Sequence, residues 1–252
     1  QFGQLIERDI TAVVKEVNRQ HSFKYQCAVG NSYGGYSATM LAMIHPEQYQ
    51  CVMAGFGIYD LILLFNTSNF RSGENYSKLI EKTVGAYSDS LINVSPVYLA
   101  EKLRAPILLF GGKKDNIADF EHTNRFHYVL QRQQHPVETI FYANTGHGHN
   151  DWWGDRHEAA FKVDYLTRTL ALPELPSAGL SDDAKRALAE DQVVLADGYS
   201  YEKRLENDQE RALHYYRKAA DLGEERALFN VGAYYHRGEV VSKDPLKAEQ
   251  FY

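Results

Sequence analysis

A serine flanked by glycines is the first feature of this sequence that suggests chemistry. The segment Gly30-Asn-Ser-Tyr-Gly-Gly-Tyr36 contains the pattern Gly-x-Ser-x-Gly with one additional glycine. A short apolar run precedes the segment and a helix-forming run follows it, which is the strand–turn–helix context of a nucleophile elbow. Such a turn would lift the Ser32 hydroxyl away from a sheet and direct helix N–H groups at a developing oxyanion. A chance glycine-rich turn is the alternative, and this context argues against it.

A serine hydroxyl is a weak nucleophile, so it needs a base and a group that orients the base. Asp115 follows the apolar run 106–110 and the pair Gly111-Gly112, at the end of a strand, where the ligand-facing loops of parallel sheets lie. His147 lies in a glycine-flanked loop after the next predicted strand. The order serine, acid, histidine is that of α/β-hydrolases, so we predict a catalytic triad of Ser32, Asp115 and His147.

Other acidic residues near these positions have simpler explanations. Asp119 lies just before a predicted helix and is interpreted as its N-cap. Asp60 follows the strand 51–54 and is expected to shape a loop. Together His147, His149 and Asp151 form a loose H-x-H-x-D pattern, but the triad explains His147 better than a metal site does. No metal or other cofactor is therefore predicted.

The remaining histidines receive no catalytic role. We expect His149 to be solvated or to lie behind the triad. The others are interpreted as surface residues of helices and loops, namely His122, His127, His135 and His157.

Strands and helices alternate over the first 170 residues. Apolar runs predict strands at 25–29, 51–54, 106–110 and 137–142, and helical periodicity predicts helices at 4–19, 37–44, 76–84, 120–133 and 155–170. The first helix carries Leu5, Ile6, Ile10, Val13, Val14 and Val17 at helical spacing, and the last is expected to point Ala159, Phe161, Val163, Leu166 and Leu170 inward. This alternation predicts the α/β class, with a parallel sheet covered by helices on both faces.

The composition changes after residue 172. Residues 173–180 contain two prolines and a glycine and are interpreted as a linker. Beyond them no strand is predicted, and Asn207-Asp-Gln-Glu-Arg-Ala-Leu-His-Tyr-Tyr216 recurs in similar form at 243–252, an offset of 36 residues. A period in the thirties with two helices per unit indicates an all-α solenoid at 181–252 that is incomplete at its C-terminus.

Both parts resemble known families. Residues 1–172 resemble the catalytic domain of prolyl-oligopeptidase-type serine peptidases, through Gly30–Tyr36, Ser95-Pro96, Ala105–Gly112, Asp115 and Tyr142–Gly148. The resemblance implies Ser32 as nucleophile, Asp115 as orienting acid, His147 as general base and the Tyr33 N–H as an oxyanion donor. Gly111-Gly112 and Ala118-Asp119 depart from the family's usual His-Gly and Val-Pro. Residues 195–252 resemble Sel-like repeats, which implies protein interaction; the combination suggests a bacterial source.

Two apolar segments near the predicted site have alternative interpretations. One segment carries the apolar residues Ile58, Leu61, Ile62, Leu64 and Phe65. It either walls a substrate pocket, as the resemblance implies, or packs a loop. Trp152 and Trp153 either pack against the domain or wall the substrate site, and the sequence does not separate these roles.

Bulk composition excludes several classes of protein. The 252 residues are 44% hydrophobic with a net charge of −6, which argues against a general nucleic-acid binder. No apolar run is long enough to span a membrane. The only cysteines, Cys27 and Cys51, are expected to be buried thiols, with a bridge between neighbouring strands as the alternative.

We expect the first strands of the hydrolase domain, and the loop with the second oxyanion donor, to lie outside these residues. Loss of one such donor costs on the order of 10²–10³ in turnover, so the 252 residues alone should be weakly active. The favoured hypothesis is a serine peptidase acting on peptides through an acyl-enzyme. An esterase with the same triad, acting on ester substrates, and a noncatalytic scaffold in which the repeats act are the alternatives.

Overall fold

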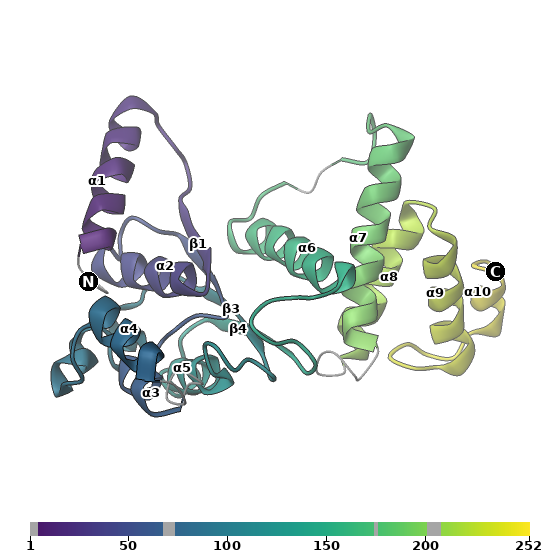
Figure 1. The fold of residues 1–252 in the computed structure, drawn as a ribbon. Coiled ribbons are helices and arrows are strands. Elements are labelled where there is room, and N and C mark those ends of the chain that lie inside the picture. The colour runs from purple at the N-terminus through teal and green to yellow at the C-terminus, as the bar shows by residue number, and fades with distance from the viewer. Residues whose placement is uncertain (1–4, 68–73, 174–175, 201–207) are drawn as a thin grey trace. The chain divides into compact units, whose positions relative to one another are not determined.

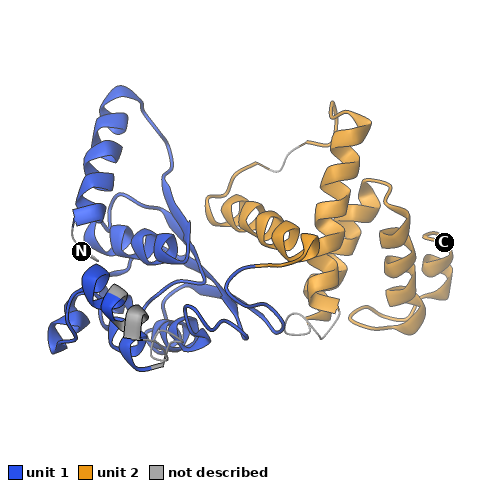
Figure 2. Cartoon of the chain, in the orientation of Figure 1, with its two compact units in different colours: residues 1–148 blue, residues 149–252 orange. Residues whose placement is uncertain are grey.

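The computed structural model describes residues 5–67, 74–173, 176–200 and 208–252 (Figure 1). The chain forms two compact units, Gln1–Gly148 and His149–Tyr252 (Figure 2). The division into residues 1–172, 173–180 and 181–252 stays a prediction; residues 174–175 of the predicted linker, residue 4 and Asn207 lie outside the described part.

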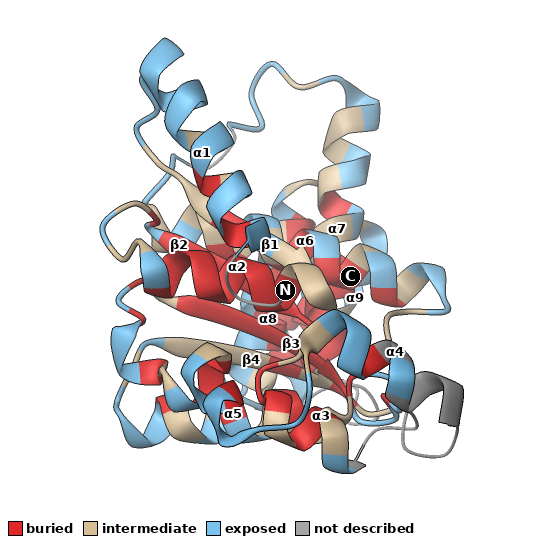
Figure 3. Cartoon of the chain, turned by 60° about the vertical axis from the view of Figure 1, so that its left-hand side comes forward, coloured by how far each residue is buried: buried red, intermediate tan, exposed pale blue. Residues whose placement is uncertain are grey.

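The first unit is built on a four-stranded parallel sheet with the order β1-β2-β3-β4. Its strands are β1 (Cys27–Asn31), β2 (Cys51–Gly55), β3 (Ile107–Gly112) and β4 (Val137–Tyr142). Every residue of β2 and β3 is buried, as Figure 3 shows in red. Strands covered on both faces read as continuous apolar runs, which explains why β2 and β3 were predictable from sequence. Strands β1 and β4 are only partly buried, yet their predicted bounds also agree within about two residues.

Helix α1 (Leu5–Gln20) precedes the sheet, and further helices connect its successive strands. The connecting helices are α2 (Tyr33–Ile44), α3 (Leu61–Thr67), α4 (Glu74–Val84) and α5 (Phe120–Arg132), with 3₁₀ helices η2 (Asp89–Val94), η3 (Pro96–Tyr98) and η4 (Ala100–Lys102). The α2 residue Tyr36 and the α5 residue Phe126 share one apolar cluster with Val52 and Ile107 of the sheet. Both helices therefore cover the same face, and the α/β class is confirmed.

Helix α1 does not bury the face that its apolar spacing suggests. Its buried residues are Glu7 and Thr11, and the Ser37 hydroxyl on α2 donates a 2.8 Å hydrogen bond to the Glu7 carboxylate. Exposed apolar side chains lie elsewhere on the helix, at Leu5, Ile6, Val13 and Val17. Ile10 of the predicted stripe packs, partly buried, against the main apolar cluster. The polar contact with α2 and this part of the stripe together therefore set the orientation of α1.

The second unit is entirely helical in its described residues. It contains α6 (Trp152–Thr169), α7 (Asp182–Ser200), α8 (Gln209–Asp221), α9 (Glu225–Arg237) and α10 (Pro245–Glu249). Asp208 and Asp244, which are 36 residues apart, cap α8 and α10 in the same way, each accepting the N–H three residues on. The structural repeat therefore has the register seen in the sequence.

The buried face of α6 differs in part from the predicted one. Phe161 is buried as predicted, but Ala159 and Val163 are exposed, and His157 and Tyr165 are buried in addition. His157 stacks between Trp153 and Phe161, at centroid distances of 4.7 and 5.9 Å. Aromatic stacking adds to simple area burial, so this row of rings rather than the aliphatic residues decides which side of α6 turns inward. The expectation that His157 is a surface residue was wrong.

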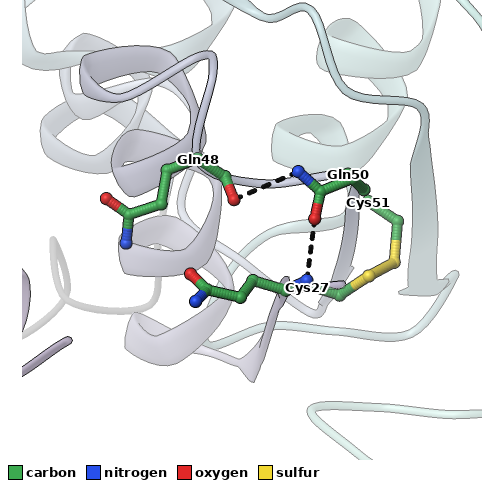
Figure 4. The surroundings of a disulfide bond; sticks show 5 residues. Cys27, Gln48, Gln50 and Cys51 are labelled. Atoms are coloured by element: carbon green, nitrogen blue, oxygen red, sulfur yellow. Dashed lines mark hydrogen bonds between the residues drawn. A yellow bond between two sulfur atoms is a disulfide. The ribbon is translucent and has the colours of Figure 1, made fainter. Parts of the chain in front are cut away.

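Cys27 and Cys51 form a disulfide, so the expectation of two free thiols was wrong (Figure 4). The two residues are direct partners in the parallel register of β1 and β2, and their Cα atoms are 4.7 Å apart. That separation lies in the range that a disulfide requires. Beside the bond, the Gln50 side chain accepts the Gln26 backbone N–H at 2.8 Å, which ties the two strand starts together a second time.

Among the described residues, none of the helices has both the length and the apolar character needed to cross a bilayer.

Candidate active site

Ser32 occupies a strained turn between β1 and α2. Its backbone has φ 57° and ψ −124°, a conformation that residues with a side chain seldom adopt. The Ser32 N–H donates to the Gly55 carbonyl at the end of β2 (2.8 Å), and the Ser32 carbonyl accepts the Gly35 N–H (3.0 Å). The turn is therefore held by the neighbouring strand on one side and by the first turn of α2 on the other.

Two glycines make room for this turn. A Cβ on Gly30 would lie 2.3 Å from the Gly34 carbonyl oxygen, and one on Gly35 would lie 2.9 Å from the Gly55 carbonyl oxygen. By contrast, a Cβ on Gly34 would meet no heavy atom within 4 Å. The close packing of the elbow thus depends on Gly30 and on the additional glycine of the motif, not on Gly34.

Asp115 is fixed in the loop that follows β3. One carboxylate oxygen, Oδ1, accepts the N–H groups of Ile117 (2.9 Å) and Ala118 (3.0 Å). The side chain is only 1% exposed. These bonds leave the other oxygen, Oδ2, to face His147.

His147 joins the acid to the serine. Its Nδ1 lies 2.8 Å from Asp115 Oδ2 and its Nε2 lies 2.8 Å from Ser32 Oγ. The loop that carries it turns tightly, because the Gly148 N–H donates to the Gly146 carbonyl at 3.0 Å and Gly148 has φ 99°. The three residues predicted from sequence are therefore brought together within hydrogen-bonding distance.

Gly112, the last residue of β3, permits this approach. A Cβ at Gly112 would lie 2.2 Å from the Gly146 carbonyl oxygen and 2.4 Å from that of Thr145. Any side chain there would push the histidine loop away from the sheet. The sequence offers the Gly-Gly pair before Asp115 as a signal, but its steric role emerges only from the structure.

Phe56 forms a second strained position beside the site. It has φ 49° and is 2% exposed, and its ring packs edge-on toward His147 at a centroid distance of 6.4 Å. This residue follows directly after β2, next to the strand that carries Ser32. Sequence reasoning did not single it out, since nothing in its residue type signals a left-handed backbone.

Two rival acids have structural roles. The Asp119 carboxylate accepts the Glu121 N–H at 2.9 Å, which confirms it as the N-cap of α5. Asp60 accepts the Leu63 N–H at 3.0 Å and pairs with Arg125 at 3.2 Å, which confirms its loop-shaping role. Both carboxylates are thus engaged away from His147.

His122, predicted as a surface residue, is buried instead. This α5 residue is 0% exposed, and its Nδ1 accepts the Asp60 N–H at 3.2 Å. Burial and the nearby Arg125 lower the pKa of His122 to about 3, so it is neutral. His149 was expected to be solvated or to lie behind the triad; its side chain is 4% exposed and bonds to Glu158 at 3.0 Å within the second unit, so the solvated alternative is wrong. His127 and His135 are half-buried.

The apolar segment after β2 packs against α4 and η2. Leu61 and Leu64 are buried against Ile80 and Leu91, and the partly buried residues Ile58, Ile62 and Phe65 join the same cluster. Trp153 packs on His157, as described above. Trp152 is 64% exposed, with the Arg156 guanidinium 5.1 Å from its ring centre.

Among the described residues no group of three or more candidate metal ligands occurs.

A parallel sheet whose strand ends bring a serine, a histidine and an aspartate together defines the class of α/β-hydrolase folds. Residues 1–172 match the prolyl oligopeptidase family, and the chain belongs to that family. Residues 189–224 and 225–252 each match the Sel1 repeat. Both resemblances inferred from sequence are thereby confirmed.

Two curated relatives each match more than half of the chain. Dipeptidyl peptidase family member 6 of Caenorhabditis elegans is 28% identical over 157 residues, which cover 59% of this chain and 21% of the relative. The acylamino-acid-releasing enzyme of Sus scrofa is 20% identical over 148 residues, covering 56% of this chain and 20% of the relative. The chain thus spans about a fifth of the curated relatives it matches.

Solved structures show the same fold. Pyrococcus horikoshii acylaminoacyl peptidase matches with a TM-score of 0.58 and 19% identity, over 69% of this chain and 29% of that one. A Mycobacterium tuberculosis puromycin-hydrolyzing peptidase matches with a TM-score of 0.62 and 19% identity, over 69% of this chain and 26% of that one.

Proposed function

We propose that this chain carries the catalytic centre of a serine peptidase that acts through an acyl-enzyme. The observation that carries the proposal is the position of His147, whose two ring nitrogens each lie 2.8 Å from a partner, Ser32 Oγ and Asp115 Oδ2. An imidazole so placed can take the serine proton while the aspartate holds its tautomer.

The reaction follows from this geometry. Ser32 Oγ attacks the substrate carbonyl carbon as its proton passes to His147 Nε2, and the carbonyl oxygen becomes an oxyanion. Tyr33 opens α2, so its N–H belongs to the first helical turn and is suited to stabilise that oxyanion. His147 then gives the proton to the leaving amine, and water hydrolyses the acyl-enzyme with His147 again as base.

Labelling with a fluorophosphonate probe tests the nucleophile. The probe forms a covalent bond only with an activated serine, so we expect it to label the protein and Ser32→Ala to abolish labelling. Labelling that persists in Ser32→Ala, or a folded protein that does not react, would contradict the proposal and favour a scaffold in which only the repeats act.

The same triad would serve an esterase, so the substrate class needs its own test. Similarity to enzymes named as peptidases favours an amide bond. We therefore expect a higher kcat/KM on an aminoacyl anilide than on a short-chain nitrophenyl ester of matched size. The opposite order, with labelling intact, would assign the chain to the esterases. We further propose that the Sel1 repeats bind a protein partner.

A further inference from the structure

The repeats build the same side-chain arrangement twice. In each copy a cation from one helix lies over a tyrosine of the preceding helix, and that tyrosine stacks on a second aromatic ring. The copies are Tyr199, Arg211 and Tyr215, and, 36 residues later, Tyr235, Lys247 and Phe251. The cation lies 5.5 Å from the ring centre in the first copy and 4.4 Å in the second, and the ring pairs are 6.0 and 5.8 Å apart.

The two copies differ in charge. In the first, the Arg211 guanidinium pairs with the Asp208 carboxylate at 3.2 Å and is neutralised. In the second, the equivalent Asp244 accepts the backbone N–H of Lys247 at 3.0 Å, but no carboxylate among the described residues pairs with the ammonium. The constellation around Tyr235 therefore keeps its positive charge.

Arg217 adds a second cation to the later copy. It projects from α8, and its guanidinium donates a 2.8 Å hydrogen bond to the Tyr235 hydroxyl. Helices α8, α9 and α10 pack in succession, so one residue from each meets at this tyrosine (Figure 1). The residue 36 positions before Arg217 is Ser181, which precedes the first matched repeat, so the earlier copy lacks this cation.

This lack of acidic partners is unusual within the second unit. Most of its described cations pair with a carboxylate, namely Arg156, Lys162, Arg168, Lys185, Arg186, Arg211, Arg226 and Arg237. Arg217, Lys243 and Lys247 have no such pair within the described part of the chain, and two of the three meet at Tyr235. Both cations also act on the Tyr235 hydroxyl. The hydrogen bond from Lys247, together with Arg217, lowers the pKa of Tyr235.

We propose that Arg217, Tyr235 and Lys247 bind a carboxylate in an acidic segment of a protein partner. Both cations are exposed, so a ligand can reach them, whereas Tyr235 is buried and holds them in place. A planar guanidinium suits a carboxylate, and cations already fixed in position lose little freedom on binding. The net charge of −6 argues against a nucleic acid in this role. The inference names the partner class for the proposed interaction role of the repeats and does not depend on the triad.

Fluorescence anisotropy with a defined peptide tests this site. The probe is hexaglutamate with a neutral fluorophore at its N-terminus, and hexaglutamine with the same fluorophore is the control. We expect the chain to bind hexaglutamate in a salt-dependent manner and to ignore hexaglutamine. The double variant Arg217→Gln/Lys247→Gln should weaken binding by about tenfold or more, because it removes two charge-assisted hydrogen bonds.

The earlier copy supplies the matched control. Arg211→Gln removes a cation on the same scaffold, yet it should change hexaglutamate binding by less than about twofold, since Asp208 already neutralises Arg211. Equal losses for Arg211→Gln and the double variant, or no binding at all, would overturn the proposal.

Competition with inorganic phosphate tests whether the site prefers the carboxylates of a protein segment or free phosphate. Displacement of hexaglutamate only at far higher phosphate concentration supports an acidic protein segment, while tighter binding of phosphate would overturn that partner class. Fluorophosphonate labelling of the same variants reports on Ser32 alone, so failure of this site and failure of the proposed peptidase activity remain distinguishable.

Discussion

At the scale of single residues, Ser32 stands out because its backbone is strained. The turn that directs its hydroxyl at His147 requires φ 57° and ψ −124°, a backbone conformation that only glycine adopts without strain. The strain can persist because the Gly55 carbonyl and α2 hold the turn from both sides.

We therefore expect Ser32→Gly to be more stable than Ser32→Ala by about 1–3 kcal/mol, the cost of a side chain in such a conformation. Elsewhere in a protein, alanine is usually the more stabilising of the two residues. Urea denaturation of both variants measures the difference. A Ser32→Ala variant at least as stable as Ser32→Gly would mean that the turn carries no such strain.

Asp115 supports a second prediction at this scale. An amide in place of its carboxylate can present an N–H to His147 Nδ1 and so favour the wrong tautomer of the ring. Asp115→Asn should lower kcat on the order of 10⁴-fold, as in other triads, with little change in stability. Steady-state kinetics check this, and Asp119→Asn is the matched control because that residue caps α5. Similar losses in both variants would argue against a special role for Asp115.

At the scale of elements, a hydrogen bond from the residue before α3 links that helix to His122 of α5. Its imidazole accepts the Asp60 N–H, while its Nε2 is buried without a hydrogen-bond partner among the described residues. Since the pKa falls from 6.5 to about 3 on folding, the unfolded chain binds a proton between these values and the folded chain does not. Stability supplied by neutral His122 is thus complete above pH 6.5 and declines as the pH falls toward 3.

Between pH 7 and pH 5, the free energy of unfolding should fall by roughly 2 kcal/mol more in the wild type than in His122→Asn. The asparagine oxygen can still accept the Asp60 N–H, but the side chain does not titrate. Urea denaturation at both pH values provides the comparison. Parallel pH profiles of the two proteins would show that His122 titrates normally in the folded state.

The sequence predicted correctly those elements whose burial follows from the local pattern of apolar residues. Strands β2 and β3 were predictable because parallel strands covered on both faces are continuously apolar. The triad residues were predictable because the elbow glycines and the loop glycines mark turns. Burial of individual helix faces was less predictable: α1 turns Glu7 inward to meet Ser37, and α6 turns His157 inward to join a row of rings.

The sequence left the disulfide as the less favoured alternative for a related reason. Whether Cys27 and Cys51 meet depends on the register between β1 and β2, and a shift by one residue would place them on opposite faces. The charge difference between the two repeat copies could not be predicted from the sequence either. Arg217 and Tyr235 are separated by 18 residues and meet only through helix packing.

At the scale of the whole molecule, the disulfide makes stability depend on redox conditions. It closes a loop with a sequence separation of 24 residues, for which chain entropy predicts a contribution of about 3 kcal/mol. The double variant Cys27→Ser/Cys51→Ser should therefore have a free energy of unfolding lower by about that amount, which urea denaturation measures. Thiol titration of the unfolded, unreduced wild type should detect no free thiol; two reactive thiols would contradict the bond.

The segment closed by this bond contains the whole elbow, Ser32 and all of α2. A single cut in the connection 45–50, between α2 and β2, would open the backbone without separating the pieces. A nicked chain would migrate as one species until a reductant was added, and then as two. The serine would stay covalently attached to the strand that supplies its Gly55 contact, so we expect the molecule to tolerate proteolytic damage at that connection better than elsewhere.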